Sequence, residues 1–254
     1  MKLHHVRNAT LIVETEERCI LVDPMLGSAG TMPPFSVFKS KAKRNPIVGF
    51  PKESKGILEK VDHCLITHLH PDHLDKAGKA FLKERQIPIT CSLHDEKALS
   101  KAGLKVAQVL DYWKEEKFLG GSILGTPATH GYGWVTVLAG KVMGFFITLP
   151  DECSLYLSSD TIYTDDVRKI LNEYKPNISV LATGAARFDF GKPLLMTLDD
   201  AISFIHDSPG KVLANHMESI NHCPVTRNIL RDRLQKEGLR NKVWVPEDGS
   251  IIIP

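Results

Sequence analysis

The chain has 254 residues, of which 43% are hydrophobic, so it can bury a sizeable core. Its 32 basic and 30 acidic residues leave a formal charge of +2, which gives no case for a nucleic-acid or membrane surface. We expect a cytoplasmic protein with reduced thiols, because there is no signal-peptide core, no run near the roughly 20 apolar residues of a membrane span, and no CxxC among the five cysteines.

The N-terminal half begins with strand patterns and continues with alternating strands and helices. Residues 9–14 and 18–23 predict paired strands around a turn at 15–17. The apolar run 61–66 predicts a buried strand. Three further elements follow in this half: helices at 74–85 and 94–101 and a strand near 87–91.

The C-terminal half repeats this order. Consecutive strands are predicted at 134–139, 142–149 and 154–159, with a tight hairpin turn at 139–141. Later elements are helices at 164–174, 198–207 and 224–237 and strands near 178–182, 211–215 and 243–253. Two such halves favour an α+β fold, a four-layer αββα sandwich of two β-sheets flanked by helices. No flexible linker interrupts the chain, so we expect one domain over 1–254.

The most informative run lies between the predicted strand at 61–66 and the helix at 74–85. His68, His70, Asp72 and His73 place four potential metal ligands within six residues, on a loop where binding groups often lie. Residues two apart in an extended segment point the same way, so His68 and His70 can converge on one ion. Asp72 and His73 then point towards a second ion. A single loop histidine is usually only solvated, but this spacing favours a metal site.

This H-x-H-x-D-H run resembles the hallmark motif of the metallo-β-lactamase superfamily. Further motifs follow in the order of that family: His130 in a turn-rich segment, Asp160 after an apolar strand, and His216 after another. The similarity extends over roughly residues 11–216. One position departs from the family, because many relatives have glycine before the bridging aspartate and this chain has Ser159.

The resemblance implies a role for each residue of these motifs. It implies two ligand sets and a bridge: His68, His70 and His130 for the first metal, Asp72, His73 and His216 for the second, and Asp160 between them. Asp72 would also act in catalysis by accepting a hydrogen bond from the nucleophile. Asp23 would orient a ligand histidine without touching metal. The alternative for Asp23 is a simple Asp-Pro turn.

Two adjacent divalent cations imply hydrolytic chemistry. Metal-bound water has its pKa lowered to about 7, so hydroxide is available at neutral pH. We therefore predict an enzyme, a dinuclear metal-dependent hydrolase that acts through a metal-bound hydroxide on a small polar ester, lactone or phosphodiester. Zinc is the default for these mixed ligands, and manganese or iron is a competitor. Neither a Gly-x-Ser-x-Gly elbow nor a phosphate-cradling loop is present.

The long proline-rich segment 25–60, with its basic cluster at 39–44, fits either a lid or a solvated surface loop. Its Asn45-Pro46 step and the simple ligand set resemble the branch of L-ascorbate-6-phosphate lactonase and N-acyl-phosphatidylethanolamine phospholipase D. Two other readings of the fold remain: an RNA-processing nuclease, which normally has a protruding basic arm, and an iron-binding redox or sensor protein. The complete ligand set argues against the redox proteins that bind one iron.

Several polar residues follow the predicted strand ends and are candidates for substrate binding: Tyr132, Tyr163, Arg187 and His222, with Lys192, Glu218 and Arg227 nearby. A cation there would suit a phosphate or carboxylate, so we predict a small anionic substrate. Arg187 could equally pair with Asp189. Cys223 follows His222 and could approach the site, but a core or loop thiol is the favoured interpretation. A homo-oligomer is compatible with the sequence.

Overall fold

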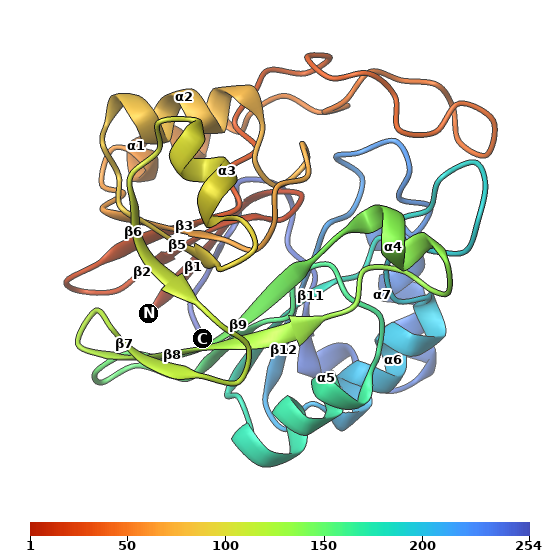
Figure 1. Cartoon of the computed structure of the whole chain (residues 1–254). Coiled ribbons are helices and arrows are strands. Elements are labelled where there is room, and N and C mark those ends of the chain that lie inside the picture. The colour runs from red at the N-terminus through yellow and green to blue at the C-terminus, as the bar shows by residue number, and fades with distance from the viewer.

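Two mixed β-sheets face each other at the centre of the protein, in a computed structural model that describes residues 1–254 (Figure 1). Antiparallel pairs at one side of the first sheet give way to parallel pairs at the other. Its strands are, in order across the sheet, β14 (Ile251–Ile252), β1 (Lys2–Arg7), β2 (Thr10–Glu14), β3 (Cys19–Val22), β4 (His63–Ile66), β5 (Ile89–Ser92) and β6 (Val106–Leu110).

The second sheet has the same plan. Its order is β13 (Val243–Trp244), β12 (Lys211–Asn215), β11 (Ile178–Ala182), β10 (Leu155–Leu157), β9 (Val142–Thr148), β8 (Gly121–Ala128) and β7 (Glu115–Phe118). Strands β7 to β10 pair antiparallel, whereas β10 to β13 pair parallel. The two halves of the chain therefore build two similar sheets.

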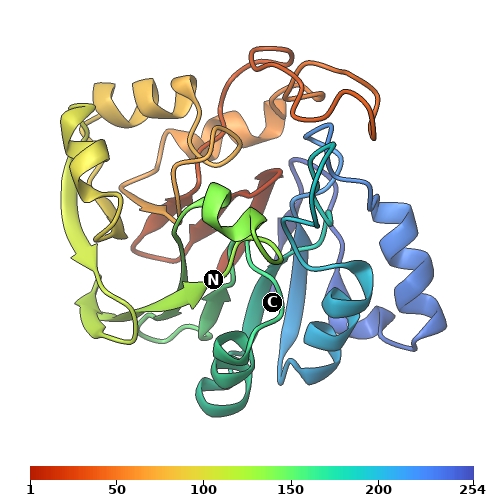
Figure 2. The ribbon, with the colours of Figure 1, turned by 45° about the vertical axis from the view of Figure 1, so that its right-hand side comes forward.

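Helices cover the outer faces of both sheets (Figure 2). The helical elements are η1 (Lys52–Ser54), α1 (Lys55–Leu58), α2 (Lys76–Glu84) and α3 (Glu96–Lys101), then α4 (Val135–Ala139), α5 (Asp165–Lys169), the π-helical turn η2 (Ile170–Tyr174), α6 (Leu198–Asp207), α7 (Arg227–Lys236) and η3 (Arg240–Lys242). Side-chain caps start several of them; Thr197 and Asp200, for example, form a reciprocal capping box on α6. None of these helices has the length and apolar character needed to cross a membrane.

Three apolar layers explain the four-layer arrangement. In β2, Leu11 and Val13 point into the core between the sheets, while Ile12 points outwards to the layer that includes Leu82 of α2. This follows from the two-residue period of a strand. A third layer joins the outer face of the second sheet to α5, α6 and α7. Both faces of each sheet are thus covered, and the predicted αββα sandwich is confirmed.

Two predicted strands are wrong. Most of residues 134–139 form the helix α4. Val135 and Ala139, four residues apart, lie on the same helix face and pack in a small apolar cluster with Leu194 and Leu195. Gly140 ends this helix with a φ of 79°, so 139–141 is not a hairpin turn. The predicted strand 243–253 is two short strands in different sheets. Four strands were not predicted: β1, β6, β7 and β8.

Candidate metal centre

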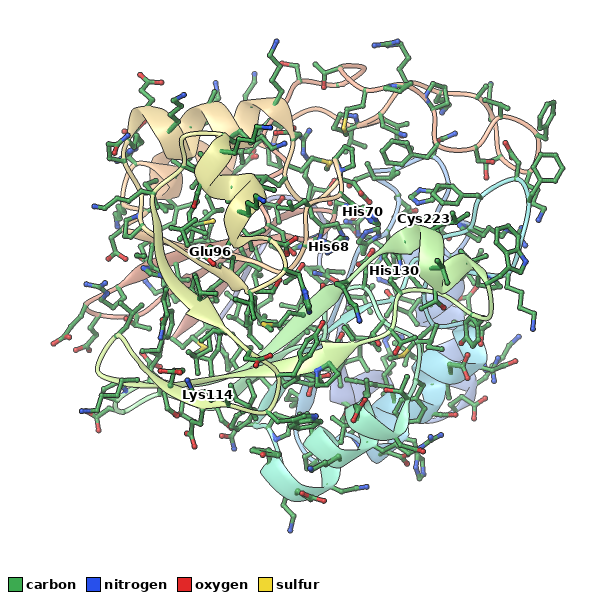
Figure 3. All side chains as sticks on the ribbon, in the orientation of Figure 1. His68, His70, Glu96, Lys114, His130 and Cys223 are labelled. Atoms are coloured by element: carbon green, nitrogen blue, oxygen red, sulfur yellow. The ribbon has the colours of Figure 1, made fainter.

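The predicted ligands meet at one edge of the two sheets. Asp23 follows β3, the His68–His73 loop follows β4, Asp160 follows β10, and His216 follows β12. Since the carboxyl ends of parallel strands lie at the same edge of a sheet, these segments converge there. His130 arrives just after β8, which runs in the same direction as β10. Figure 3 shows His68, His70 and His130 near the middle of the molecule, between the two sheets.

Three imidazoles form the first half-site, which we define as His68, His70 and His130. His68 Nε2 lies 3.1 Å from His70 Nδ1, and His130 Nε2 lies 3.3 Å from the same atom. His68 and His130 are buried, whereas His70 is partly exposed. The three nitrogens point at a common position.

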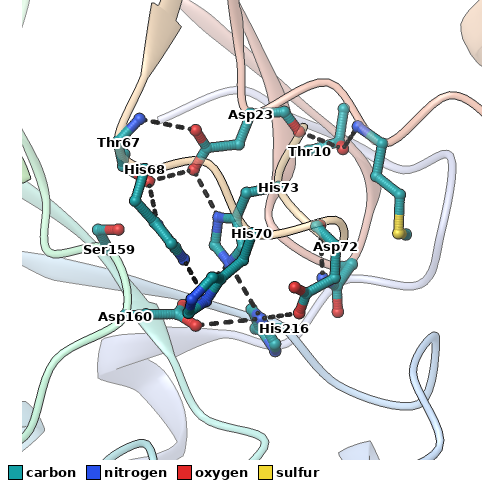
Figure 4. A network of polar contacts seen from close by, with 12 residues as sticks. Thr10, Asp23, Thr67, His68, His70, Asp72, His73, Ser159, Asp160 and His216 are labelled. Carbon is teal, nitrogen blue, oxygen red and sulfur yellow. Dashed lines mark hydrogen bonds and ion pairs between the residues drawn. The ribbon is translucent and has the colours of Figure 1, made fainter. Parts of the chain in front are cut away.

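Two imidazoles and a carboxylate form the second half-site, which we define as Asp72, His73 and His216 (Figure 4). His73 Nε2 lies 3.2 Å from His216 Nε2, which in turn lies 3.3 Å from Asp72 Oδ2. The Asp160 carboxylate lies between the half-sites, with Oδ1 3.2 Å from His73 Nε2 and Oδ2 3.5 Å from His130 Nε2.

These side chains fit one or more divalent transition metals. Imidazole nitrogens that face one another at 3.1–3.3 Å cannot all be satisfied by mutual hydrogen bonds, because a neutral ring has one donor and one acceptor. Asp160 Oδ1 is buried and makes no hydrogen bond. Buried carboxylates together with imidazoles are the donor set that zinc, manganese and iron accept.

Outer contacts fix which nitrogen of three histidines, His73, His130 and His216, faces the centre. His130 Nδ1 donates to the Leu194 carbonyl at 2.9 Å, and His73 Nδ1 donates to Asp23 Oδ2 at 2.8 Å. His216 Nδ1 lies 3.6 Å from Cys223 Sγ. In each ring Nε2 is therefore the nitrogen that faces the centre. Such outer partners orient metal-binding imidazoles and set their tautomers.

Asp23 reaches both half-sites. Its Oδ2 accepts from the Thr67 hydroxyl at 2.7 Å as well as from His73, and its Oδ1 accepts from the Thr67 amide at 2.9 Å. Because the Thr67 proton goes to the carboxylate, Thr67 Oγ1 accepts from His68 Nδ1 at 3.0 Å. One carboxylate thereby orients one histidine of each half-site.

The two half-sites hold protons differently. Burial lowers the pKa of His70 to about 4 and that of His68 well below its ordinary value, so both are neutral at pH 7. Burial also acts against a charged His73, but the Asp160 and Asp23 carboxylates outweigh it and raise the pKa of His73 to about 10. The second half-site therefore carries protons that a metal ion must displace.

Comparison with known proteins gives the family. The sequence profile described as "Beta-lactamase superfamily domain" matches residues 18–217. "UPF0173 protein YddR" of Bacillus subtilis is 31% identical over 98% of both chains. The chain belongs to the metallo-β-lactamase superfamily. It is a metal-dependent hydrolase, and YddR places it with the UPF0173 proteins of that superfamily.

Two solved structures share the whole superfamily fold with this chain. One is described as a possible metal-dependent hydrolase from Veillonella parvula, with a TM-score of 0.90 and 28% identity, covering 99% of this chain and 98% of that one. The other is isothiocyanate hydrolase from Delia radicum gut bacteria, with a TM-score of 0.90 and 32% identity, covering 100% and 99%.

Ser159, which precedes Asp160, has a backbone conformation that suits the glycine expected at this position. Its φ is +58°, in the left-handed region that costs a residue with a side chain about 1–2 kcal/mol. Asp23 and His216, with φ of 46° and 59°, also lie in this region. The positive φ values at these three strand ends turn the chain sharply. The turns bring the side chains of Asp23, Asp160 and His216 to the centre.

A cavity of about 110 Å³ opens over the ligands. Its walls are Phe35, Pro71, Phe188, Leu194 and His222, above His70, Asp72, His130 and Asp160. The His222 ring contacts Phe35 edge-on at 5.2 Å between centroids and stacks on Phe188 at 5.8 Å. His222 Nδ1 is buried and has no hydrogen-bond partner. Of the four predicted substrate-binding residues, His222 alone lines the cavity.

The other three candidates do not line it. The Tyr132 hydroxyl donates to Asp200, and the Tyr163 hydroxyl donates to Asp207 at 2.5 Å. Arg187 is exposed, and Asp189, its predicted alternative partner, bonds elsewhere. Instead, Asp189 accepts hydrogen bonds from the residues of a distant loop, Ser36, Val37, Phe38 and Lys39.

The other cations near the predicted site are also elsewhere. Arg227 is held by Glu218 at 2.7 Å and by Asp248, and Lys192 is exposed. No cationic side chain therefore lines the cavity, so the lining gives the predicted anionic substrate no support.

Sequence reasoning undervalued or missed residues that support the centre. Cys223 contacts His216, which agrees with the less favoured of its two interpretations. Asn8 donates from Nδ2 to the Asp72 carbonyl at 3.1 Å and accepts the His216 amide at 3.0 Å. Thr67, next to the motif, could have been suspected as a support. Nothing in the sequence pointed to Asn8, because its role depends on the contact between β1 and two distant loops.

Proposed function

We propose that this hydrolase is dinuclear, with one ion at each half-site and Asp160 between them. When bound, the two ions would lower the pKa of a water molecule to about 7 and polarise the bond to be cleaved. Zinc is our first choice, with manganese or iron as alternatives. The proposal is supported by three overlapping groups of ligand atoms, each within 4.8 Å.

The chain's own residues would position the reactants. Asp72 borders the cavity, where its carboxylate would accept a hydrogen bond from the attacking nucleophile. His222 would donate a hydrogen bond to the heteroatom of the substrate that gains charge, since a buried polar atom without a partner is costly. Phe35 and Phe188 would hold the substrate's apolar part.

We propose a small uncharged electrophile with a compact apolar group as the substrate. The observation that carries this proposal is the cavity lining, which is aromatic and apolar apart from His222 and the ligands. Esters, lactones and isothiocyanates share this description, and the similar structure from Delia radicum gut bacteria is an isothiocyanate hydrolase. The wall offers no cationic side chain to a phosphodiester, so the two metal ions alone would have to neutralise its charge.

Other readings have less support. A cavity of about 110 Å³ is below the range of about 300–1,000 Å³ usual for drug-sized ligands, which disfavours a nuclease. No observation favours an iron-binding redox or sensor role. The narrower likeness to the lactonase and the phospholipase D stays a prediction. So do the single domain over 1–254, the cytoplasmic location and the homo-oligomer.

The test compares kcat/KM for phenyl isothiocyanate, p-nitrophenyl acetate, a simple lactone and bis(p-nitrophenyl) phosphate. We expect activity on at least one of the first three substrates to exceed that on the phosphodiester and to vanish with EDTA. His222→Phe and Phe188→Ala should each lower kcat/KM by about tenfold or more. Phe190→Ala is the matched control, because Phe190 is in the same loop and does not line the cavity. A preference for the phosphodiester would contradict the proposal.

A further inference from the structure

An exposed apolar surface lies beside the cavity, on segments next to its wall residues Phe35 and Phe188. We define the rim as residues 33–44, 132–141 and 187–193. Five large apolar side chains of the rim are mostly exposed: Phe38 (80%), Phe190 (75%), Val137 (84%), Leu138 (72%) and Trp134 (60%). Val37 is also exposed. Scattered exposed apolar residues are normal, but a gathering of this kind marks an interaction site.

The three rim segments form one continuous surface. The rings of Phe38 and Phe190 lie 6.3 Å apart between centroids. Gly191 faces Trp134 so closely that a Cβ there would lie 3.2 Å from Cζ2. The Asp189 carboxylate, which accepts from the Val37 amide at 2.8 Å, ties the first segment to the third. In Figure 1 the three segments lie on the right-hand side of the molecule, the side that Figure 2 turns towards the viewer.

The rim is strongly basic although the chain is nearly neutral. It contains seven basic residues and one acidic residue, Asp189: the basic ones are Lys39, Lys41, Lys43, Arg44, Lys141, Arg187 and Lys192. The whole chain has 32 basic and 30 acidic residues, so 25 basic and 29 acidic residues lie outside the rim. All seven rim cations are exposed.

We propose that the rim docks on the surface of an anionic phospholipid bilayer. Aromatic and aliphatic side chains enter the interface between headgroups and acyl chains, while lysines and arginines lie among the anionic headgroups. The charge of the rim favours a bilayer over a second copy of the chain as the partner. A rim-to-rim dimer would place seven cations against seven, which repel one another. Val137 and Leu138, which cannot stack on bases, distinguish it from a nucleic-acid surface.

Docking would place the cavity mouth at the membrane. Phe35 and Phe188 belong both to the rim and to the cavity wall. An apolar molecule dissolved in the bilayer could then enter the cavity without crossing bulk water. The docking proposal does not depend on which substrate the enzyme hydrolyses. The proposed docking and the proposed substrate can therefore be disproved separately.

Vesicle sedimentation of the metal-loaded full chain tests the proposal. The protein should sediment with phosphatidylcholine vesicles that contain phosphatidylserine at low salt, and much less with phosphatidylcholine alone or at high salt. Lys41→Glu/Lys43→Glu and Phe38→Ser/Phe190→Ser should each weaken binding by at least about tenfold. Matched controls are Lys76→Glu/Lys79→Glu on α2 and Ile251→Ser/Ile253→Ser, which change exposed residues outside the rim and should leave binding unchanged.

Three results would overturn the proposal. One is wild-type protein that stays in the supernatant with the anionic vesicles. Another is equal loss of binding in the rim and control variants. The last is a stable oligomer in light scattering that Phe38→Ser/Phe190→Ser converts to monomer, which would make the rim an interface between copies. Hydrolysis of a water-soluble ester should be unchanged in the rim variants, so a failed docking test says nothing against the proposed chemistry.

Discussion

The first half-site consists of three imidazoles, His68, His70 and His130, whose pKa values are all lowered by burial, and its His70 is partly exposed. The second is fully buried, contains the Asp72 carboxylate, and has an outer contact for every member, from Asn8, Asp23 or Cys223. We infer that the second half-site is the more rigid and more charged of the two. The first, with two histidines in the cavity wall, is the one more open to substrate.

The largest effect should come from Asp72, which belongs to the second half-site and also borders the cavity. We expect Asp72→Asn to lower kcat by about 10²–10⁴-fold even where metal is retained, because the nucleophile loses its acceptor. Elemental analysis of the same preparation separates loss of catalysis from loss of metal. A fully loaded variant with nearly normal kcat would show that Asp72 is a ligand only.

Proton release should distinguish the half-sites. The pKa of His73 is raised to about 10, so His73 is protonated at pH 7 and must lose a proton to bind metal. The affinity of this half-site should therefore rise about tenfold per pH unit below pH 10 for each proton released. His70, with a pKa of about 4, is already neutral, so affinity at the first half-site should be flat above pH 5.

Calorimetric titration of metal-free protein in buffers of different ionisation enthalpy measures this directly. We expect one ion to bind at pH 7 with no proton released from its histidines and the other with at least one. If both ions release the same number of protons, the two half-sites do not differ in their protonation, which would contradict this prediction.

Variants of Asp23 and Thr67 should differ in which half-site they weaken. The Asp23 variant should weaken metal binding at both half-sites, and the Thr67 variant at the first alone. Asp23→Asn removes an acceptor that serves His73 and, through Thr67, His68, so both ions should bind about 10–100-fold more weakly. Thr67→Val breaks the link to His68 alone and should weaken only the first ion. Competition with a chromophoric chelator gives the two stepwise constants. A selective loss of the second ion in Thr67→Val would contradict this route.

A smaller effect is expected at Cys223, whose sulfur contacts His216 on the side away from the metal position. Cys223→Ala should weaken the second ion by a few-fold, up to about tenfold, and Cys223→Ser should restore part of the loss. Cys153→Ala is the control, since Cys153 is exposed. An equal change in both binding constants would mean that Cys223 acts through packing.

Much of this architecture could be predicted from the sequence because its signals are local. The H-x-H-x-D-H run, strands that end in Asp23, Asp160 or His216, and the strand–helix alternation each occupy a few residues. Segment 134–139 misled us because its β-branched residues suit a strand, and only the packing of Val135 and Ala139 against Leu194 shows a helix.

The features that could not be predicted depend on distant contacts. Phe35 and Phe188 form one cavity wall although more than a hundred residues separate them. The anionic substrate was predicted from cations after strand ends, but position along the chain does not say that Arg227 is neutralised by Glu218 and Asp248. Likewise, a net charge of +2 conceals a basic rim on an otherwise acidic molecule.

Metal stoichiometry tests the central claim, two ions joined through Asp160, most directly. Elemental analysis of protein saturated with zinc or manganese and then desalted should give close to two ions per chain. His216→Ala should retain about one ion, whereas Asp160→Ala should lower occupancy of both half-sites together. Wild-type protein that saturates at one ion per chain, or an Asp160→Ala variant that keeps one site intact, would contradict the dinuclear account.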